Sequence, residues 1–188
     1  MRIGIDVDGV LADQERALLV LLNEIHKQHY TYEDIDDWGA VERLFKISKG
    51  DMLRNMEQVW ACGEVGRLID LKELASLIMK HHILGNTVYI VSKRTPRSWP
   101  YVIRWLDVEH TKVDGVVFLA GDDSKFDYPI DLMIDDNPKL AVEAATYGKE
   151  LMLVDQPWNQ VINNSEWVTR VGSVGEALNL LLPGVYYE

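Results

Sequence analysis

The first ten residues, MRIGIDVDGV, decide the fold, and the rest of the chain is arranged around them. Their apolar start predicts a short buried strand that ends at two carboxylates, Asp6 and Asp8, before Gly9. Side chains alternate along an extended segment, so Asp6 and Asp8 can converge on one point if the chain turns at Gly9. Because open α/β sheets bind ligands at the carboxyl ends of their strands, we expect a cation or a phosphoryl group at this point.

Further apolar segments predict more strands, with helical patterns between them. These segments are residues 87–91, 116–119, 132–134 and 151–154, with a short edge strand at 168–171. Apolar strands that alternate with helices are typical of a parallel sheet covered on both faces. We therefore expect an α/β protein with a doubly wound, Rossmann-like parallel sheet.

Residues 14–68 contain helical patterns and aromatic side chains but no convincing strand. We interpret this segment as a small helical cap, inserted after the first strand and lying over the carboxyl edge of the sheet. The core domain then comprises residues 1–13 and 69–188. The alternative is an ordinary helical layer of the main core, but the first crossover would then be unusually long.

The composition excludes several classes of protein. A chain of 188 residues with 47% hydrophobic and 26% charged residues is typical of a globular domain, and a net charge of -11 argues against binding to duplex nucleic acid. The longest apolar run, residues 17–22, is too short to span a membrane.

The single Cys62 cannot form an internal disulfide, and we expect it to be a small core residue. The simplest expectation is a cytoplasmic protein, and the sequence leaves a homodimer open.

Polar residues of catalytic type follow the predicted strands. Parallel strands end at one edge of a sheet, so these residues can meet at one site. Several carboxylates in one place repel each other unless a cation compensates them, and Mg²⁺ prefers oxygen ligands, so the pattern predicts Mg²⁺. A lysine and a serine in the same place suit a phosphate. The residues are Asp6, Asp8, Ser92, Lys125, Asp135 and Asp136.

The segment DVDGVLAD, residues 6–13, resembles the first motif of the haloacid dehalogenase (HAD) superfamily of phosphotransferases. Ser92, Lys125 and the pair Asp135–Asp136 match its second, third and fourth motifs in the expected order. Within the superfamily the chain is most similar to the cytosolic 5′(3′)-deoxyribonucleotidase group. The features that carry this resemblance are the first motif, the short helical cap, and the segments IDDNP and DQPWN, which begin at residues 134 and 155. The likeness spans nearly the whole chain.

The resemblance implies a Mg²⁺-dependent phosphomonoesterase for a small phosphorylated substrate, a 5′-nucleotide or deoxynucleotide. Asp6 would be the nucleophile that forms an aspartyl-phosphate, and Asp8 the general acid and base. A free Asp has a pKa of about 3.9, so its neighbours must perturb the pKa of Asp8 if it is to arrive protonated. Mg²⁺ would be held by Asp6, the backbone carbonyl of Asp8, and Asp135 and Asp136, of which we favour Asp136 as the direct ligand.

The phosphate-binding residues implied by the resemblance are Ser92 and Lys125, with Lys93 beside Ser92. The pair Lys93–Arg94 is more basic than we expect in an enzyme for nucleoside monophosphates. It would bind a second phosphate or the backbone of a polynucleotide end, or it is a charged loop that pairs with the acidic edge. The sequence leaves both interpretations open.

Aromatic residues in the predicted cap are candidates for stacking on a base, because such stacking contributes about 1–3 kcal/mol. Trp38 and Phe45 are favoured over Trp60, and the alternative for all three is packing in a hydrophobic core. The acidic residues 122–123 are interpreted as part of a solvated loop.

Two other functions stay open. One is a HAD phosphatase for another phosphate, such as a sugar phosphate or a polynucleotide end. The other is a receiver-like phospho-signalling domain, which also combines acidic residues, a Ser or Thr and a Lys on a parallel sheet. Receivers place the phosphorylated Asp after a later strand, whereas Asp6 follows the first, and this favours the enzyme.

Overall fold

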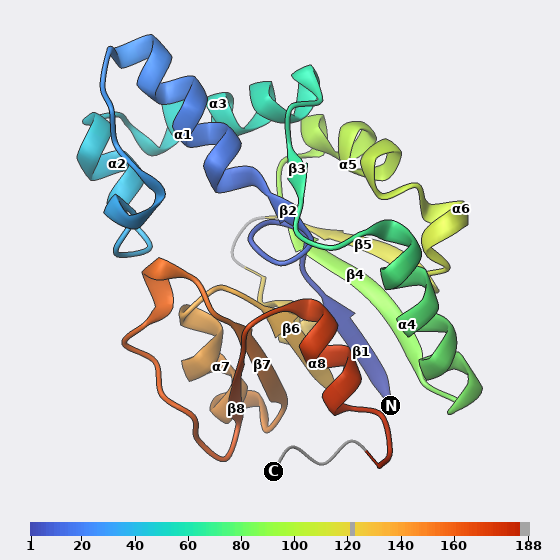
Figure 1. The fold of residues 1–188 in the computed structure, drawn as a ribbon. Helices are drawn as coiled ribbons and strands as arrows, with labels where there is room; N and C mark the ends of the chain where they lie inside the picture. Colours follow the sequence, from blue (N-terminus) through green and yellow to red (C-terminus); the bar gives the residue numbers. More distant parts are fainter. Residues whose placement is uncertain (121–122, 185–188) are drawn as a thin grey trace.

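A six-stranded parallel sheet forms the centre of the protein (Figure 1). The computed structural model describes residues 1–120 and 123–184, so Asp122 lies outside the described residues. The strand order is β5-β4-β1-β6-β7-β8, which is the doubly wound arrangement that the sequence predicts. The strands are β1 (Arg2–Ile5), β4 (Thr87–Lys93), β5 (Gly115–Leu119), β6 (Leu132–Asp135), β7 (Glu150–Val154) and β8 (Val168–Val171).

The position of β1 in the middle of the sheet fixes which loops meet. Ile5 pairs with Ile90 of β4 on one side and with Ile134 of β6 on the other. The chain therefore winds outward from β1 in two directions, and the carboxyl ends of β4, β1 and β6 lie next to one another. This is the switch point at which open α/β sheets bind ligands.

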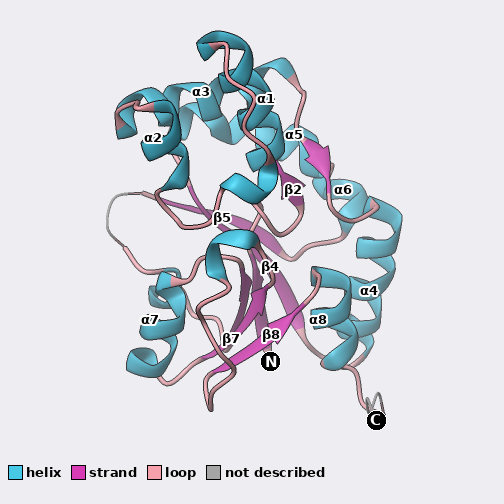
Figure 2. Ribbon diagram, turned by 60° about the vertical axis from the view of Figure 1, so that its left-hand side comes forward, coloured by secondary structure: helices cyan, strands magenta, loops and turns pink. Residues whose placement is uncertain are grey.

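Helices cover both faces of the sheet (Figure 2). Helices α4 (Leu71–Ile83) and α8 (Val174–Leu180) lie on one face, and α7 (Lys139–Tyr147) lies on the other. The sequence of β6 matches this arrangement, because Ile134 belongs to the cluster under α4 and α8 whereas Met133 belongs to the cluster under α7. Strands buried on both faces are apolar throughout, which is why continuous apolar segments in the sequence located them.

A helical insertion, residues 14–68, lies beyond the carboxyl ends of the strands (Figure 1). It starts and ends at a two-stranded antiparallel stem, β2 (Ala12–Asp13) and β3 (Gly66–Arg67). Its interior is a separate hydrophobic cluster that includes Leu18, Leu22 and Phe45. The helical elements between the two stem strands are α1 (Gln14–His26), η1 (Tyr32–Asp34), α2 (Ala40–Phe45) and α3 (Lys49–Cys62).

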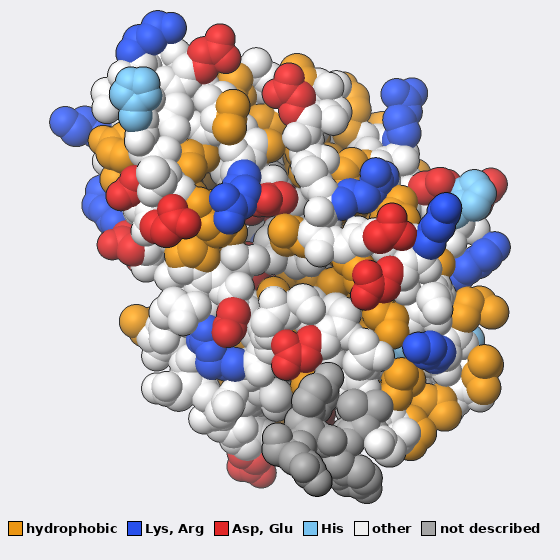
Figure 3. Space-filling model, viewed as in Figure 1, with side chains coloured by type: hydrophobic (Ala, Val, Ile, Leu, Met, Phe, Trp, Pro, Cys, Tyr) orange, Lys and Arg blue, Asp and Glu red, His pale blue; other side chains and the backbone are white. Residues whose placement is uncertain are grey.

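The remaining helical elements connect the strands. They are α5 (Trp99–Leu106) and α6 (Val108–Thr111), and the single 3-10 turns η2 (Pro96–Ser98), η3 (Lys125–Asp127) and η4 (Pro157–Asn159). None of the helices in the described part of the chain combines the length and hydrophobicity needed to cross a membrane. On the face shown in Figure 3, acidic and basic side chains are interspersed rather than gathered in one basic area.

Three sequence predictions differ from the structure in detail. Cys62 is exposed at the end of α3, so the expectation of a core residue is wrong. The helical pattern of α3 continues to Cys62, but the residue falls on its solvent side. The stem strand β3 was missed, because two residues are too few to show a period. Strand β4 continues through Ser92 to Lys93, because both residues pair with β5.

We expect Leu22→Ala, in the interior of the helical insertion, to lower the free energy of unfolding by about 2–5 kcal/mol. Leu22 is 0% exposed, so the truncation leaves a cavity among buried side chains. Val20→Ala on the same helix is the matched control, because Val20 is 65% exposed, and it should change stability by less than about 0.5 kcal/mol. Urea unfolding measures the free energy of unfolding of both variants. An equal loss in Leu22→Ala and Val20→Ala would contradict the burial of Leu22 in the insertion.

Candidate active site

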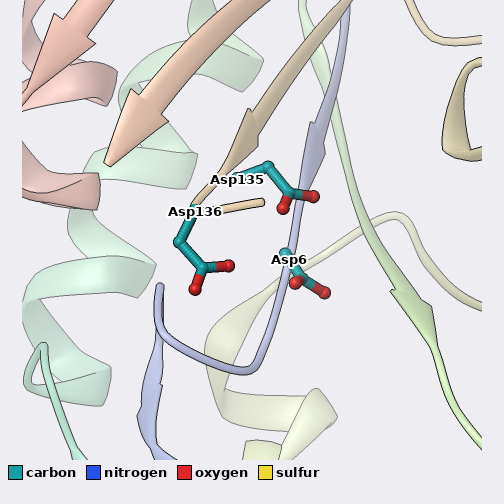
Figure 4. A group of neighbouring side chains, drawn as sticks. All are labelled: Asp6, Asp135 and Asp136. Carbon is teal, nitrogen blue, oxygen red and sulfur yellow. The ribbon is translucent and has the colours of Figure 1, made fainter. Parts of the chain in front are cut away.

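Three buried carboxylates form the centre of the site at the ends of β1 and β6 (Figure 4). Asp6 follows β1, and its backbone N–H donates to the carbonyl of Ile134 at 2.9 Å, which continues the β1–β6 pairing. Asp135 ends β6, and Asp136 comes next. One oxygen from each of Asp6, Asp135 and Asp136 lies within 4.8 Å of the others. The strand register therefore brings together acids that are about 130 residues apart in the chain.

Lys125 joins two of these acids. Its Nζ lies 2.8 Å from Asp6 Oδ2 and 2.7 Å from Asp135 Oδ2, and its side chain is buried. The ion pairs outweigh the opposing effect of burial and raise the pKa of Lys125. Phe126, the next residue in η3, is buried in the sheet core and anchors the turn that carries Lys125. Lys125 is therefore a fixed positive charge beside Asp6.

The carboxylates carry more negative charge than Lys125 balances. Burial raises the pKa of Asp135 to about 7, although Lys125 opposes the shift. Burial and the neighbouring Asp135 raise the pKa of Asp136 well above its ordinary value. Asp6 Oδ1 is buried without a hydrogen-bond partner among the described residues. Buried acids and an unpartnered carboxylate oxygen fit a hard divalent cation such as Mg²⁺, which takes oxygen ligands.

The turn after β1 packs directly against Asp136. Gly9 has φ +71°, and a Cβ atom at this position would lie 2.2 Å from Asp136 Oδ2. Trp158 Nε1 donates to the same carboxylate at 3.1 Å, and Gln156 Nε2 donates to the carbonyl of Gly9 at 2.7 Å. Glycine at position 9 is thus required both by the backbone angle and by the approach of Asp136.

Asp8, in the turn after β1, pairs with Arg94. The Arg94 guanidinium donates from Nη2 to Asp8 Oδ2 and from Nε to Ser92 Oγ, the latter at 3.3 Å. It also lies over the Trp60 ring, 4.7 Å from the ring centre. Burial raises the pKa of Asp8, and the charge of Arg94 opposes this rise. A raised pKa is what a residue needs in order to hold a proton for transfer near neutral pH.

The first turn of α1 adds two residues whose roles the sequence did not indicate. Gln14 Oε1 accepts a hydrogen bond of 2.6 Å from Trp60 Nε1. Glu15 has a buried Oε2 without a partner among the described residues, and burial together with Asp8 raises its pKa to about 8. In the sequence both look like ordinary polar residues at a helix start, so only the packing of α1 against α3 shows where they lie.

The structure gathers most of the predicted site residues but separates others. Lys93 is exposed, and its Nζ donates to the carbonyl of Asp123 at 3.0 Å. Phe45 is 5% exposed and packs edge-on against Tyr30 inside the helical insertion, so neither of its faces is open to a base. Trp38 is 45% exposed. The residues brought together around the acidic centre are Asp6, Asp8, Ser92, Arg94, Lys125, Asp135 and Asp136.

Comparison with known proteins identifies the fold. CbbY from Rhodobacter sphaeroides, solved as a variant with xylulose-(1,5)bisphosphate, has a TM-score of 0.60 at 15% identity and covers 93% of this chain and 95% of that chain. Protein tyrosine kinase A (PtkA) from Mycobacterium tuberculosis has a TM-score of 0.67 at 14% identity, covering 98% of each chain. YfnB from Bacillus subtilis, described as a candidate HAD hydrolase and solved with bound magnesium, has a TM-score of 0.56 at 15% identity, covering 96% of this chain and 97% of that chain.

The chain therefore has the fold of the HAD-like hydrolases, with the acidic centre at the carboxyl edge of the sheet. No protein-family model matches the sequence, and no curated protein matches it. At identities of 14–15% the structural likeness defines the fold and leaves the substrate open.

The acidic centre should make stability depend on pH. The pKa of Asp135 rises from 3.8 to about 7 on folding, so the folded state binds more protons than the unfolded state between these values. Its contribution to the free energy of unfolding therefore falls as pH rises through this interval. We expect Asp135→Asn to gain stability relative to the wild-type protein over the same interval in the presence of a chelator.

Urea unfolding at a series of pH values measures this difference. In the wild-type protein, Mg²⁺ at neutral pH should restore stability, because a cation that binds the folded state stabilises it. A difference in the free energy of unfolding between variant and wild type that does not change from pH 4 to 7 would contradict a pKa of Asp135 raised by burial.

Proposed function

We propose that this protein is a Mg²⁺-dependent phosphomonoesterase that uses Asp6 as its nucleophile and prefers 5′-nucleotides or deoxynucleotides. The observation that carries the proposal is the placement of Asp6. It lies at the end of the central strand, in contact with Lys125, and it keeps Oδ1 free of hydrogen bonds among the described residues. Asp8, two residues later, pairs with Arg94 and has a pKa that burial raises.

The reaction would proceed in two steps. In the first, a carboxylate oxygen of Asp6 forms a bond to phosphorus, the bond from phosphorus to the leaving oxygen breaks, and Asp8 gives its proton to that oxygen. In the second, water attacks the aspartyl-phosphate, Asp8 takes a proton from the water, and inorganic phosphate leaves with Asp6 restored. Lys125 and Ser92 would hold the phosphoryl oxygens in both steps.

Mg²⁺ would be held by Asp6, the backbone carbonyl of Asp8, and Asp135 and Asp136, with Asp136 favoured as a direct ligand. When bound, it supplies positive charge that offsets the repulsion between an anionic nucleophile and an anionic phosphate. Trp158 donates to Asp136 and Gly9 packs on it, so the orientation of this carboxylate is fixed by contacts within the chain.

Residues 14–68 would act as a cap domain over a core of residues 1–13 and 69–188. The separate hydrophobic cluster of the insertion and its two-stranded stem support this division. Trp60 on α3 is 3% exposed and has Arg94 over one face, so it is a packed residue of the pocket wall rather than an open stacking surface. Nucleotide preference is supported by the resemblance of residues 134–138 and 155–159 to the deoxyribonucleotidase group.

A second candidate is a phosphatase for sugar phosphates. CbbY has the same fold and was solved with xylulose-(1,5)bisphosphate. The phosphoryl-transfer residues of a phosphatase do not depend on the leaving group, so this candidate uses Asp6, Asp8 and Lys125 in the same roles.

Replacing the nucleophile should abolish turnover. We expect Asp6→Asn to lower the rate of phosphate release at least about a thousandfold, because an amide cannot form the phosphoenzyme. Asp107→Asn, between α5 and α6 and away from the acidic centre, is the matched control and should keep the wild-type rate. The rate of phosphate release in the presence of Mg²⁺ is measured for both variants. Wild-type activity in Asp6→Asn would exclude Asp6 as the nucleophile.

A screen of phosphomonoesters tests the preferred substrate. We expect the highest kcat/KM for 5′-nucleotides and deoxynucleotides, lower values for sugar phosphates and a 5′-phosphorylated oligonucleotide, and no turnover with a chelator. A flat profile would overturn the nucleotide preference while leaving the phosphatase in place. Release that continues without a divalent cation would count against the metal site.

A further inference from the structure

Arg94 occupies a position that the two reaction steps do not explain. Its side chain is 6% exposed, although a guanidinium is costly to bury unless its charge and its N–H groups are matched. It lines a pocket together with Asp8, Glu57 and Trp60. Lys125 already provides the positive charge beside Asp6, and it does not line this pocket. Arg94 is therefore a second buried cation, placed in the pocket that Asp8 lines.

The hydrogen bonds of Arg94 leave part of its guanidinium unused. Among the described residues, Nη2 donates to Asp8 and Nε donates to Ser92. The two N–H groups of Nη1 have no hydrogen bond to any of these residues. Trp60 holds the guanidinium plane from one face, so the remaining donors have a fixed direction. A planar group with free donors suits the oxygens of a phosphate.

We propose that Arg94 binds a second phosphate on the leaving group, which makes the substrate class a phosphomonoester whose leaving group carries another phosphate. This inference rests on the proposed phosphatase function and narrows its substrate. Lys93, next in the chain, also lines the pocket, but its Nζ donates to the carbonyl of Asp123, so the inference rests on Arg94 alone. Leaving groups without an anion would leave the Nη1 donors unpaired in the pocket, and sites built for a hydrogen bond discriminate against ligands that lack it.

The test compares substrates with and without a second phosphate on the leaving group. The pairs are adenosine 5′-monophosphate with adenosine 3′,5′-bisphosphate, glucose 6-phosphate with glucose 1,6-bisphosphate, and a nucleotide with a 5′-phosphorylated dinucleotide. The three pairs distinguish a nucleoside bisphosphate, a sugar bisphosphate and a polynucleotide end as the source of the second phosphate. The variants are Arg94→Met, which removes the charge, and Arg94→Lys, which keeps it without the planar group.

In at least one pair, we expect the wild-type protein to have a higher kcat/KM for the member whose leaving group carries the second phosphate. Arg94→Met should lower kcat/KM for that member by roughly 10- to 100-fold more than for its partner, since hydrogen bonds to charged groups contribute about 1.5–3 kcal/mol. Arg94→Lys should recover part of the difference. The control is Arg97→Gln, which removes an exposed arginine of η2 three residues away and should leave both members unchanged.

Equal losses on both members of every pair would overturn the inference, because Arg94 would then act only by positioning Asp8. The phosphatase function would survive that result. A binding measurement separates the two proposals: the Asp6→Asn protein with Mg²⁺ should bind the favoured member more tightly than its partner by calorimetry, and Arg94→Met should remove the difference. Equal binding of both members by the Asp6→Asn protein would also overturn the inference.

Discussion

The ion pairs of Lys125 with Asp6 and Asp135 are the interaction on which the site depends. They join the end of β1, the end of β6 and the turn η3, three segments that the chain visits far apart. The 2.8 Å distance from Lys125 to Asp6 holds only while β1 lies directly beside β6. The order of the strands is therefore a requirement of the site as well as of the core. A different neighbour for β1 would separate Asp6 from Lys125 and leave Lys125 paired with Asp135 alone.

Charge balance also explains why the acidic centre is built from buried residues. Burial raises the pKa values of Asp135 and Asp136, so the folded chain favours the neutral form of at least one of them until a cation arrives. The same burial would strengthen interactions with a charged ligand, because the local dielectric is low. One arrangement thus accounts both for the raised pKa values and for the suitability of the acidic centre for a divalent cation.

Periodicity and strand-end reasoning predicted the sheet, its helices and the positions of Asp6, Ser92, Lys125 and Asp135, because these depend on local patterns and on the rule that parallel strands end at one edge. The residues that the sequence did not identify depend on packing between distant segments. Trp158 reaches Asp136 only because η4 folds back over β6, and Gln14 meets Trp60 only because α1 packs on α3. Phe45 is aromatic, as a base-stacking residue would be, but it is buried in the hydrophobic cluster of the insertion.

The two-stranded stem has a mechanical consequence. Strand β2 begins at Ala12, and the turn between Asp8 and Ala12 is held by hydrogen bonds from Gly9 N–H to Ala12 O and from Ala12 N–H to Val7 O. The helical insertion and Asp8 are thus attached to the two ends of one short loop that these hydrogen bonds hold. A substitution that loosened this loop would therefore disturb the placement of the insertion and of the Asp8 carboxylate together.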